Sequence, residues 1–87
     1  MVVSGFDWDD DNIQHVGLHR YSPEEVEEVF AGDHRVRRSR HGRYIAMGET
    51  LDGRWAFVVF CRLPGGRIRV ITARDMESNE RRRYGRK

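Results

Sequence analysis

The sequence predicts a small α+β domain: two N-terminal helices, a four-stranded antiparallel meander sheet and a C-terminal helix. The chain has 87 residues, enough for one domain with one core, and we place that single domain over residues 1–87. Apolar residues recur with helical spacing before residue 33 and with strand spacing after it. Short turn signals separate the strand-like segments, which is typical of antiparallel strands joined in chain order.

The first helix is expected just after the aromatic N-terminal segment. Asp9 or Asp10 is suited to cap it, and the helix then runs to about Leu18. Ile13 and Val16 have the spacing of an inner, apolar face.

The segment SPEEVEEVF carries the clearest helix signals in the chain. Ser22 is the expected N-cap, Pro23 fits the first helical position, and Glu25 completes a capping box. Gly32 is a suitable stop. The apolar stripe of this helix consists of Val26, Val29 and Phe30.

Three strand-like segments follow residue 33. Residues 35–40, RVRRSR, suit an exposed edge strand whose charge discourages pairing with other chains. Residues 43–50 and 54–62 form the next two strands, joined by a turn at Asp52-Gly53. Because both faces of residues 54–62 are apolar, we expect this strand to lie centrally in the sheet.

A final strand and helix complete the predicted order. Pro64-Gly65-Gly66 turns the chain into the strand RIRVITAR, and Asp75 or Ser78 then caps a helix of roughly ten residues. Strict alternation divides this strand between two faces of the sheet. Arg67, Arg69, Ile71 and Ala73 are expected on one face, and Ile68, Val70, Thr72 and Arg74 on the other.

Charge divides the chain into an acidic and a basic part. Residues 1–34 hold nine acidic residues and one basic residue, and residues 35–87 hold fifteen basic and five acidic residues. Fifteen of the sixteen basic residues are arginine, which binds phosphate bidentately and stacks on bases. A GC-rich gene is an alternative explanation for the excess of arginine over lysine. It does not explain the placement of the bases, and we therefore expect the C-terminal part to face a polyanion.

Several classes of protein are disfavoured. The chain lacks a glycine-rich nucleotide loop and a Gly-x-Ser-x-Gly elbow. His15 and His19 have a helical spacing that suits a metal, but a third ligand at a matching spacing is missing, so we expect neither metal nor cofactor. Cys61 is the only cysteine and suits a small buried hydrophobe in a reducing compartment. With neither an export signal nor an apolar run near ~20 residues, we expect a cytoplasmic protein without membrane contact.

The C-terminal arginines are compatible with RNA as the polyanion, although this chemistry is not specific to them. Arg62 and Arg74 stand near strand ends, where they would form a shallow cationic trough that Tyr84 closes from the last helix. Metal-free RNA cleavage needs a base for the 2′-hydroxyl, cations for the phosphorane and an acid for the leaving oxygen. The alternative is a solvated helix whose glutamates, Glu77 and Glu80, pair with its arginines.

Six segments between Phe6 and Tyr84 carry a family resemblance, and the strand RIRVITAR before the helix ERRRY is the most specific pair. The others are FDWDDDNIQHV with His19, SPEEVEEVF, RYIAMG and WAFVVFCR. With these motifs the chain resembles the BrnT family of toxins, members of the RelE-like superfamily of small bacterial ribonucleases.

The resemblance implies a RelE-like fold and a toxin of a type II toxin–antitoxin pair that cleaves RNA and inhibits translation. The RNA is either free or on the ribosome, and 2′-hydroxyl attack would leave 2′,3′-cyclic phosphate ends. The implied partner is a BrnA-like ribbon-helix-helix antitoxin, through which alone the toxin reaches operon DNA. Catalytic candidates by position are Arg62, Arg74, Glu80, Arg81, Tyr84 and His19, with His15 beside them. RNA-binding candidates are Arg43, Arg54, Arg67 and Arg69.

The chain departs from the family pattern at two places. Family members usually have glycine directly after the position of His19 and an aliphatic residue next, where this chain has Arg20 and Tyr21. RelE-like toxins also often use lysines in catalysis, and Lys87 is the only lysine here. The alternative function, supported by the lack of an obvious general base, is a non-catalytic module that binds RNA or the antitoxin and acts in operon autoregulation.

Overall fold

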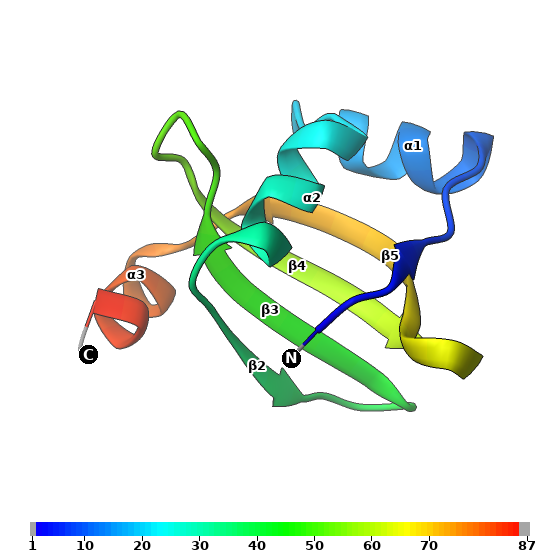
Figure 1. Cartoon of the computed structure of the whole chain (residues 1–87). Coiled ribbons are helices and arrows are strands. Elements are labelled where there is room, and N and C mark those ends of the chain that lie inside the picture. The colour runs from blue at the N-terminus through cyan, green and yellow to red at the C-terminus, as the bar shows by residue number, and fades with distance from the viewer. Residues whose placement is uncertain (1, 86–87) are drawn as a thin grey trace.

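One sheet with helices on both faces makes up residues 2–85, the part of the chain that the computed structural model describes (Figure 1). The strands lie in the order β1-β5-β4-β3-β2. In chain order the elements are β1 (Gly5–Phe6), α1 (Asp10–Gly17), α2 (Pro23–Ala31), β2 (His34–Arg38), β3 (Arg43–Glu49), β4 (Trp55–Arg62), the 3-10 turn η1 (Pro64–Gly66), β5 (Arg67–Asp75) and α3 (Ser78–Gly85).

The predicted four-stranded antiparallel meander is present, but it is extended by a fifth strand. β2, β3, β4 and β5 pair antiparallel in chain order, with β4 in the centre as expected. β1 adds to the far edge of β5 in parallel, with Gly5 opposite Arg67 and Phe6 opposite Ile68. The prediction of a purely antiparallel sheet is therefore wrong, because a strand of two residues is too short to show alternation.

The helices begin where their capping residues predict. Asp9 caps α1 and forms a capping box with Asn12, and α2 has the predicted box of Ser22 and Glu25. The expected inner face of α1 is only half correct. Val16 is buried, but Ile13 is 40% exposed, and Asn12 lies inside instead, where its amide donates to the carbonyls of Asp7 and Val70.

A first core lies between the sheet and the two N-terminal helices. Phe60 of β4 is fully buried there, and Phe30 of α2 packs edge-on against it with ring centroids 5.3 Å apart. Tyr21, which stands at one of the departures from the family pattern, is 3% exposed in this core. Its hydroxyl donates to Asp75 over 2.7 Å, so the polar end of this buried ring is satisfied.

A second core lies on the opposite face, under α3. Tyr84 is 2% exposed and packs edge-on against Trp55, with ring centroids 5.1 Å apart. The buried residues of this core are Ile45, Met47, Phe57, Met76 and Tyr84. Both faces of the central strand β4 are covered, which explains why it is apolar on both sides.

A bulge in β5 sets which residues reach which face. Val59 pairs with Thr72 but Phe60 pairs with Val70, so the register steps over Ile71. As a result Ala73 joins Val70 in the first core, and Arg74 turns to the α3 face opposite Phe57. The predicted alternation, which put Arg74 on the face of Ile68 and Val70, is therefore wrong beyond the bulge.

Candidate nucleic-acid interface

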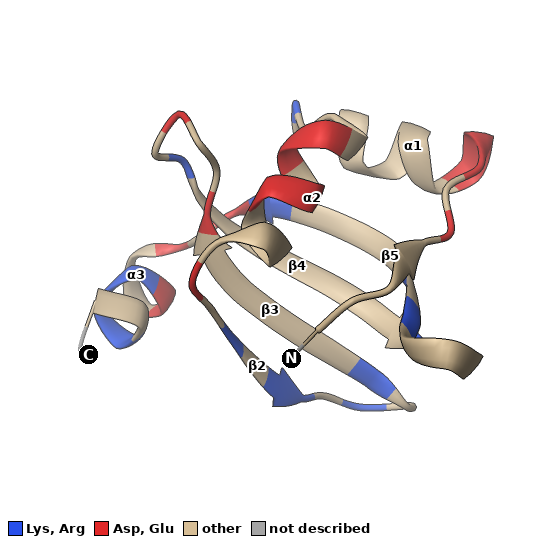
Figure 2. Cartoon of the chain, viewed as in Figure 1, with Lys and Arg blue, Asp and Glu red and all other residues tan. Residues whose placement is uncertain are grey.

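Arginines from four elements gather on the α3 face of the sheet. Residues directly opposite in antiparallel strands share a face, and Arg37 lies opposite Ile45, Arg43 opposite Cys61 and Arg74 opposite Phe57. From α3, the Arg81 guanidinium lies 5.3 Å from the Trp55 ring centroid on this side. Figure 2 shows basic residues on β2, at the start of β3, on α3 and on β5, whereas α2 carries acidic residues. We call Arg37, Arg43, Arg74 and Arg81 the arginine face.

Arg74 is the most firmly held residue of the arginine face. Its two Nη atoms donate to the two carboxylate oxygens of Glu80 at 2.7 and 2.8 Å. Its guanidinium lies 4.0 Å from the ring centroid of Phe57, and Nη1 also donates to the Asp75 carbonyl. The hydrogen bonds to Glu80 raise the pKa of Arg74, so the residue is a permanently charged and preorganised cation.

Glu80 is fixed from two sides. It is 9% exposed, and its Oε1 accepts from the Glu77 amide at 2.8 Å, which satisfies a free N–H group at the start of α3. The hydrogen bonds from Arg74 lower the pKa of Glu80, with the nearby charge of Arg37 adding to the effect. A carboxylate with a depressed pKa is a weak proton acceptor, so Glu80 is better suited to position Arg74 than to act as a base.

Tyr84, which was expected to close a cationic trough, is buried and does not present its ring to a ligand. Because the ring is buried between Trp55 and the sheet, a nucleobase cannot lie on it in this conformation. Burial raises the pKa of Tyr84, so the hydroxyl stays protonated near neutral pH. The Arg35 guanidinium lies 5.8 Å from the ring centroid, at the edge of the same core.

Arg54, a predicted RNA-binding residue, is used within the protein. Its guanidinium lies 3.8 Å from the ring centroid of Tyr21 and donates to Glu25 and Asp75 at 3.3 and 3.2 Å. It also donates to the backbone carbonyls of His19 and Arg20. Arg54 thus ties the turn after α1 to the end of β5.

The remaining predicted residues are not members of the arginine face, although Arg69, opposite Cys61, lies on the same side of the sheet. The Arg62 guanidinium is 5.0 Å from the Tyr44 ring centroid on the α1–α2 face, so the trough expected to join it to Arg74 does not form. Arg69 donates to Asp7 and Asp9 at 3.0–3.1 Å, and Arg67 lies 3.8 Å from Asp7. Two exposed histidines complete this set: His15 on α1 and His19 in the turn after it.

Arg37 is the member of the arginine face that sequence reasoning missed. The segment RVRRSR was interpreted only as a charged edge strand. Alternation around Val36, which packs against the first core, places Arg35 and Arg37 together on the opposite face. That local signal was available in the sequence, but the proximity of Arg37 to Glu80 depends on how β2 and α3 meet.

Two general features of the described chain bear on its chemistry. Residues 2–85 contain no group of three or more His, Cys, Asp or Glu side chains arranged to hold a metal ion, and metal independence stays a prediction. None of the helices in this range is long and apolar enough to cross a membrane.

Comparison with known proteins identifies the family. Residues 8–80 match the family model described as "Ribonuclease toxin, BrnT, of type II toxin-antitoxin system". The matched range includes both Arg74 and Glu80 and ends before Arg81 and Tyr84. A comparison with curated proteins found no match. The family match confirms the resemblance found in the sequence motifs.

Proposed function

The chain belongs to the BrnT family of ribonuclease toxins of type II toxin–antitoxin systems, and from this premise we propose that it is a metal-independent endoribonuclease that acts through the arginine face. Family membership implies an RNA substrate and a protein antitoxin. We further propose that the toxin inhibits translation in the cytoplasm and that its antitoxin is a BrnA-like ribbon-helix-helix protein.

The geometry of Arg74 carries this proposal. Its stacking on Phe57 and its bidentate contact with Glu80 fix the guanidinium on the sheet before substrate binds. A preorganised cation of this kind stabilises the extra negative charge of the phosphorane formed by 2′-hydroxyl attack. Arg37, Arg43 and Arg81 surround the same face and would bind neighbouring phosphates.

Proton transfer is assigned by elimination among the predicted residues. Glu80 has a lowered pKa and Tyr84 a raised one, so neither is suited to accept a proton near neutral pH. His19 is exposed, and Arg54 holds its backbone beside Asp75, the residue after Arg74. We therefore propose Arg74 as the phosphate and transition-state binder. Because His19 lies outside the arginine face, we propose it for proton transfer on the condition that bound RNA extends from Arg74 past Asp75 to the turn after α1.

A non-catalytic RNA- or antitoxin-binding module is the second candidate function. It is favoured by the Arg74–Glu80 pair, because Glu80 already occupies the bidentate edge of the strongest candidate cation. Under this alternative, the arginine face binds RNA through its other cations, with an affinity that falls as salt rises.

End analysis of RNA separates the two functions. The purified chain, shown to be folded by circular dichroism, is incubated with a defined RNA in EDTA, with and without ribosomes. We expect fragments with 2′,3′-cyclic phosphate ends that disappear on His19→Ala substitution, with His41→Ala, in an exposed turn, as the control. Salt-sensitive RNA binding with intact RNA in both conditions would instead establish the binding module.

A further inference from the structure

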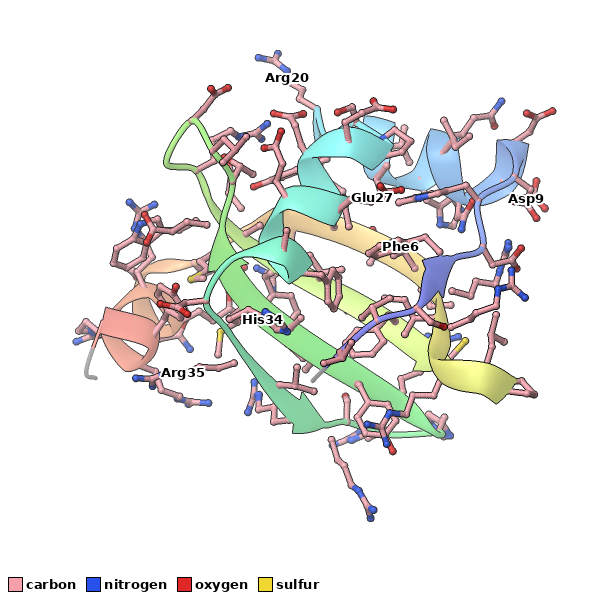
Figure 3. The ribbon with its side chains drawn as sticks, in the orientation of Figure 1. Phe6, Asp9, Arg20, Glu27, His34 and Arg35 are labelled. Carbon is pink, nitrogen blue, oxygen red and sulfur yellow. The ribbon has the colours of Figure 1, made fainter. Side chains whose placement is uncertain are left out.

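A groove lies on the side of the molecule away from the arginine face. It has a volume of about 770 Å³ and runs between the N-terminal segment, α2 and the start of β2. Figure 3 labels Phe6, Glu27 and His34, which belong to these three parts of its wall. α2 packs against the first core, so the groove and α3 are on opposite faces of the sheet.

The lining of the groove combines apolar and acidic side chains. Val2, Val3, Phe6 and Phe30 supply apolar surface, and Val2 is 92% exposed. The glutamates of the rim, from α2, are Glu24, Glu27 and Glu28. An apolar trough beside several negative charges is suited to a segment that presents both an apolar side chain and basic residues.

The glutamates are available to a ligand to different degrees. Glu27 accepts from the Trp8 indole N–H at 2.9 Å, and Glu28 accepts from the Leu51 amide at 3.0 Å. Both donors are neutral, so neither contact cancels the negative charge. Within the described chain, Glu24 has neither a hydrogen bond nor an ion pair and is exposed. The groove therefore keeps an acidic rim that a cationic partner would neutralise.

His34 adds an independent observation. Its Nδ1 lies 2.9 Å from the Gly32 carbonyl, which only accepts, so Nδ1 carries a hydrogen. The Nε2 atom of His34 is buried and has no hydrogen-bond partner among residues 2–85. A buried polar atom without a partner is costly, and for the neutral ring a donor from a ligand would remove that cost.

We propose that this groove is the docking site for a basic amphipathic segment of a partner protein. An apolar side chain of that segment packs between Val3, Phe6 and Phe30, and its lysine or arginine residues lie along the glutamates of α2. Binding is expected to open the rim of the groove far enough for a side-chain donor of the segment to reach Nε2 of His34, which is buried in the free protein. The protein antitoxin implied by the family is the partner to test. The glutamates of the groove would repel RNA, so RNA is not expected to bind there. The proposal therefore does not depend on RNA cleavage.

Hydrogen exchange of the full chain, alone and with the antitoxin encoded beside its gene, tests the proposal without RNA. We expect slower exchange in residues 2–6 and 24–34 on binding. Two variants carry the test: Glu24→Arg reverses a rim charge, and Ala31→Arg fills the groove from an exposed helical position. Each is expected to weaken antitoxin binding by roughly tenfold or more, since close charge pairs at interfaces are strongly coupled.

Matched controls separate docking from general effects. Asp52→Arg makes the same change of charge in the exposed hairpin turn and should alter the dissociation constant less than about twofold, as an uncoupled surface charge does. Thermal melting verifies that each variant is folded. Protection confined to β5 and α3, or unchanged binding by both groove variants, would overturn the proposal. So would self-association of the chain that the groove variants abolish, because the occupant would then be a second copy.

Discussion

Arg74 and Glu80 form a bidentate ion pair, with N···O distances of 2.7 and 2.8 Å, on the face of the sheet that α3 covers in part. The Glu80 side chain is 11% exposed and that of Arg74 is 30% exposed. The pair therefore joins the end of β5 to the start of α3 and also presents a fixed cation. Any substitution of Arg74 therefore changes the contact between β5 and α3 and removes the fixed cation at the same time.

Neutralising both members of the pair separates catalysis from folding. Arg74→Ala alone would leave Glu80 charged and almost buried, at a cost of about 1–3 kcal/mol in the free energy of unfolding. The double variant Arg74→Gln, Glu80→Gln removes both charges and keeps polar side chains of similar size. We expect it to remain folded while the RNA cleavage rate in EDTA falls by roughly 10²–10³.

Glu80→Gln alone is the matched control for the double variant. It keeps the Arg74 cation, so most of the cleavage rate should remain, with a loss of roughly tenfold or less from poorer positioning. Urea unfolding of both variants shows how much stability each has lost. If the double variant cleaves RNA at the wild-type rate, Arg74 is not part of the mechanism.

Arg54 is predicted to contribute to stability and not to RNA affinity. Arg54→Ala removes contacts to Glu25 and Asp75 and uncovers the ring of Tyr21, so the free energy of unfolding should fall by about 1–3 kcal/mol. Arg43→Ala, on the exposed arginine face, should cost no more than about 0.5 kcal/mol and should weaken RNA binding. Urea unfolding and an RNA-binding titration of both variants check this. If Arg54→Ala weakens RNA binding without loss of stability, Arg54 belongs to the RNA interface.

Stability is predicted to fall in acid because carboxylates, among them Glu80 and Asp75, have lowered pKa values in the folded protein. The hydrogen bonds from Arg74 lower the pKa of Glu80, and the hydrogen bond from Tyr21 lowers that of Asp75. Groups of this kind add stability above their ordinary pKa values, 4.5 and 3.8, and lose it as pH falls through the folded values.

Urea midpoints measured from pH 7 to pH 3 check this prediction. We expect little change above about pH 5 and a progressive fall below it. Glu80→Gln should show a shallower fall, because one of the responsible groups no longer titrates. A variant that loses stability in acid as steeply as the wild type would show that the ion pair with Arg74 contributes little.

Much of the fold was predictable because its signals are local. The cap at Ser22 with Glu25 located α2, and the apolar stretch of residues 54–62 located the central strand β4. β1 was missed because two residues give no periodicity, and its parallel pairing with β5 depends on the whole N-terminal segment. Bulges share this difficulty, since the step at Ile71 is visible only in how β5 pairs with β4.

The candidate site was predictable only in part for the same reason. Arg74, Glu80 and Arg81 were selected by position and do lie on one side of the molecule. Arg62 was grouped with them because it stands at the end of a neighbouring strand. Side chains alternate between the two faces along a strand, and this alternation places Arg62 over Tyr44 on the other face of the sheet. Arg54 has the sequence appearance of one more cation of the basic part, and only the fold shows that it is held by Glu25 of the acidic part and by Asp75 at the end of β5.

Gly48 is predicted to be required for the contact between β3 and α2. A Cβ atom there would lie 3.0 Å from both the His34 Cβ and a methyl group of Val29, and 3.2 Å from the Asp33 carbonyl oxygen. Gly48→Ala should therefore lower the free energy of unfolding by about 1–3 kcal/mol. Gly17→Ala, where a Cβ meets open space at the end of α1, should be neutral or stabilising by up to ~1 kcal/mol. Equal urea midpoints for the two variants would contradict this account.

Arg20 adopts a left-handed backbone conformation, with φ of 63°, in the turn after α1. Glycine adopts this conformation without the steric penalty that a Cβ brings, which explains why glycine suits the position after His19. Figure 3 shows the Arg20 side chain pointing away from the domain, so replacing it removes little packing. Arg20→Gly should raise the free energy of unfolding by about 0.5–1 kcal/mol, because relief of strain exceeds the entropy that glycine adds to the unfolded chain. Arg40→Gly, at an exposed position with negative φ, is the control and should be destabilising. If both variants lose stability in urea unfolding, the turn holds Arg20 through contacts that outweigh its backbone strain.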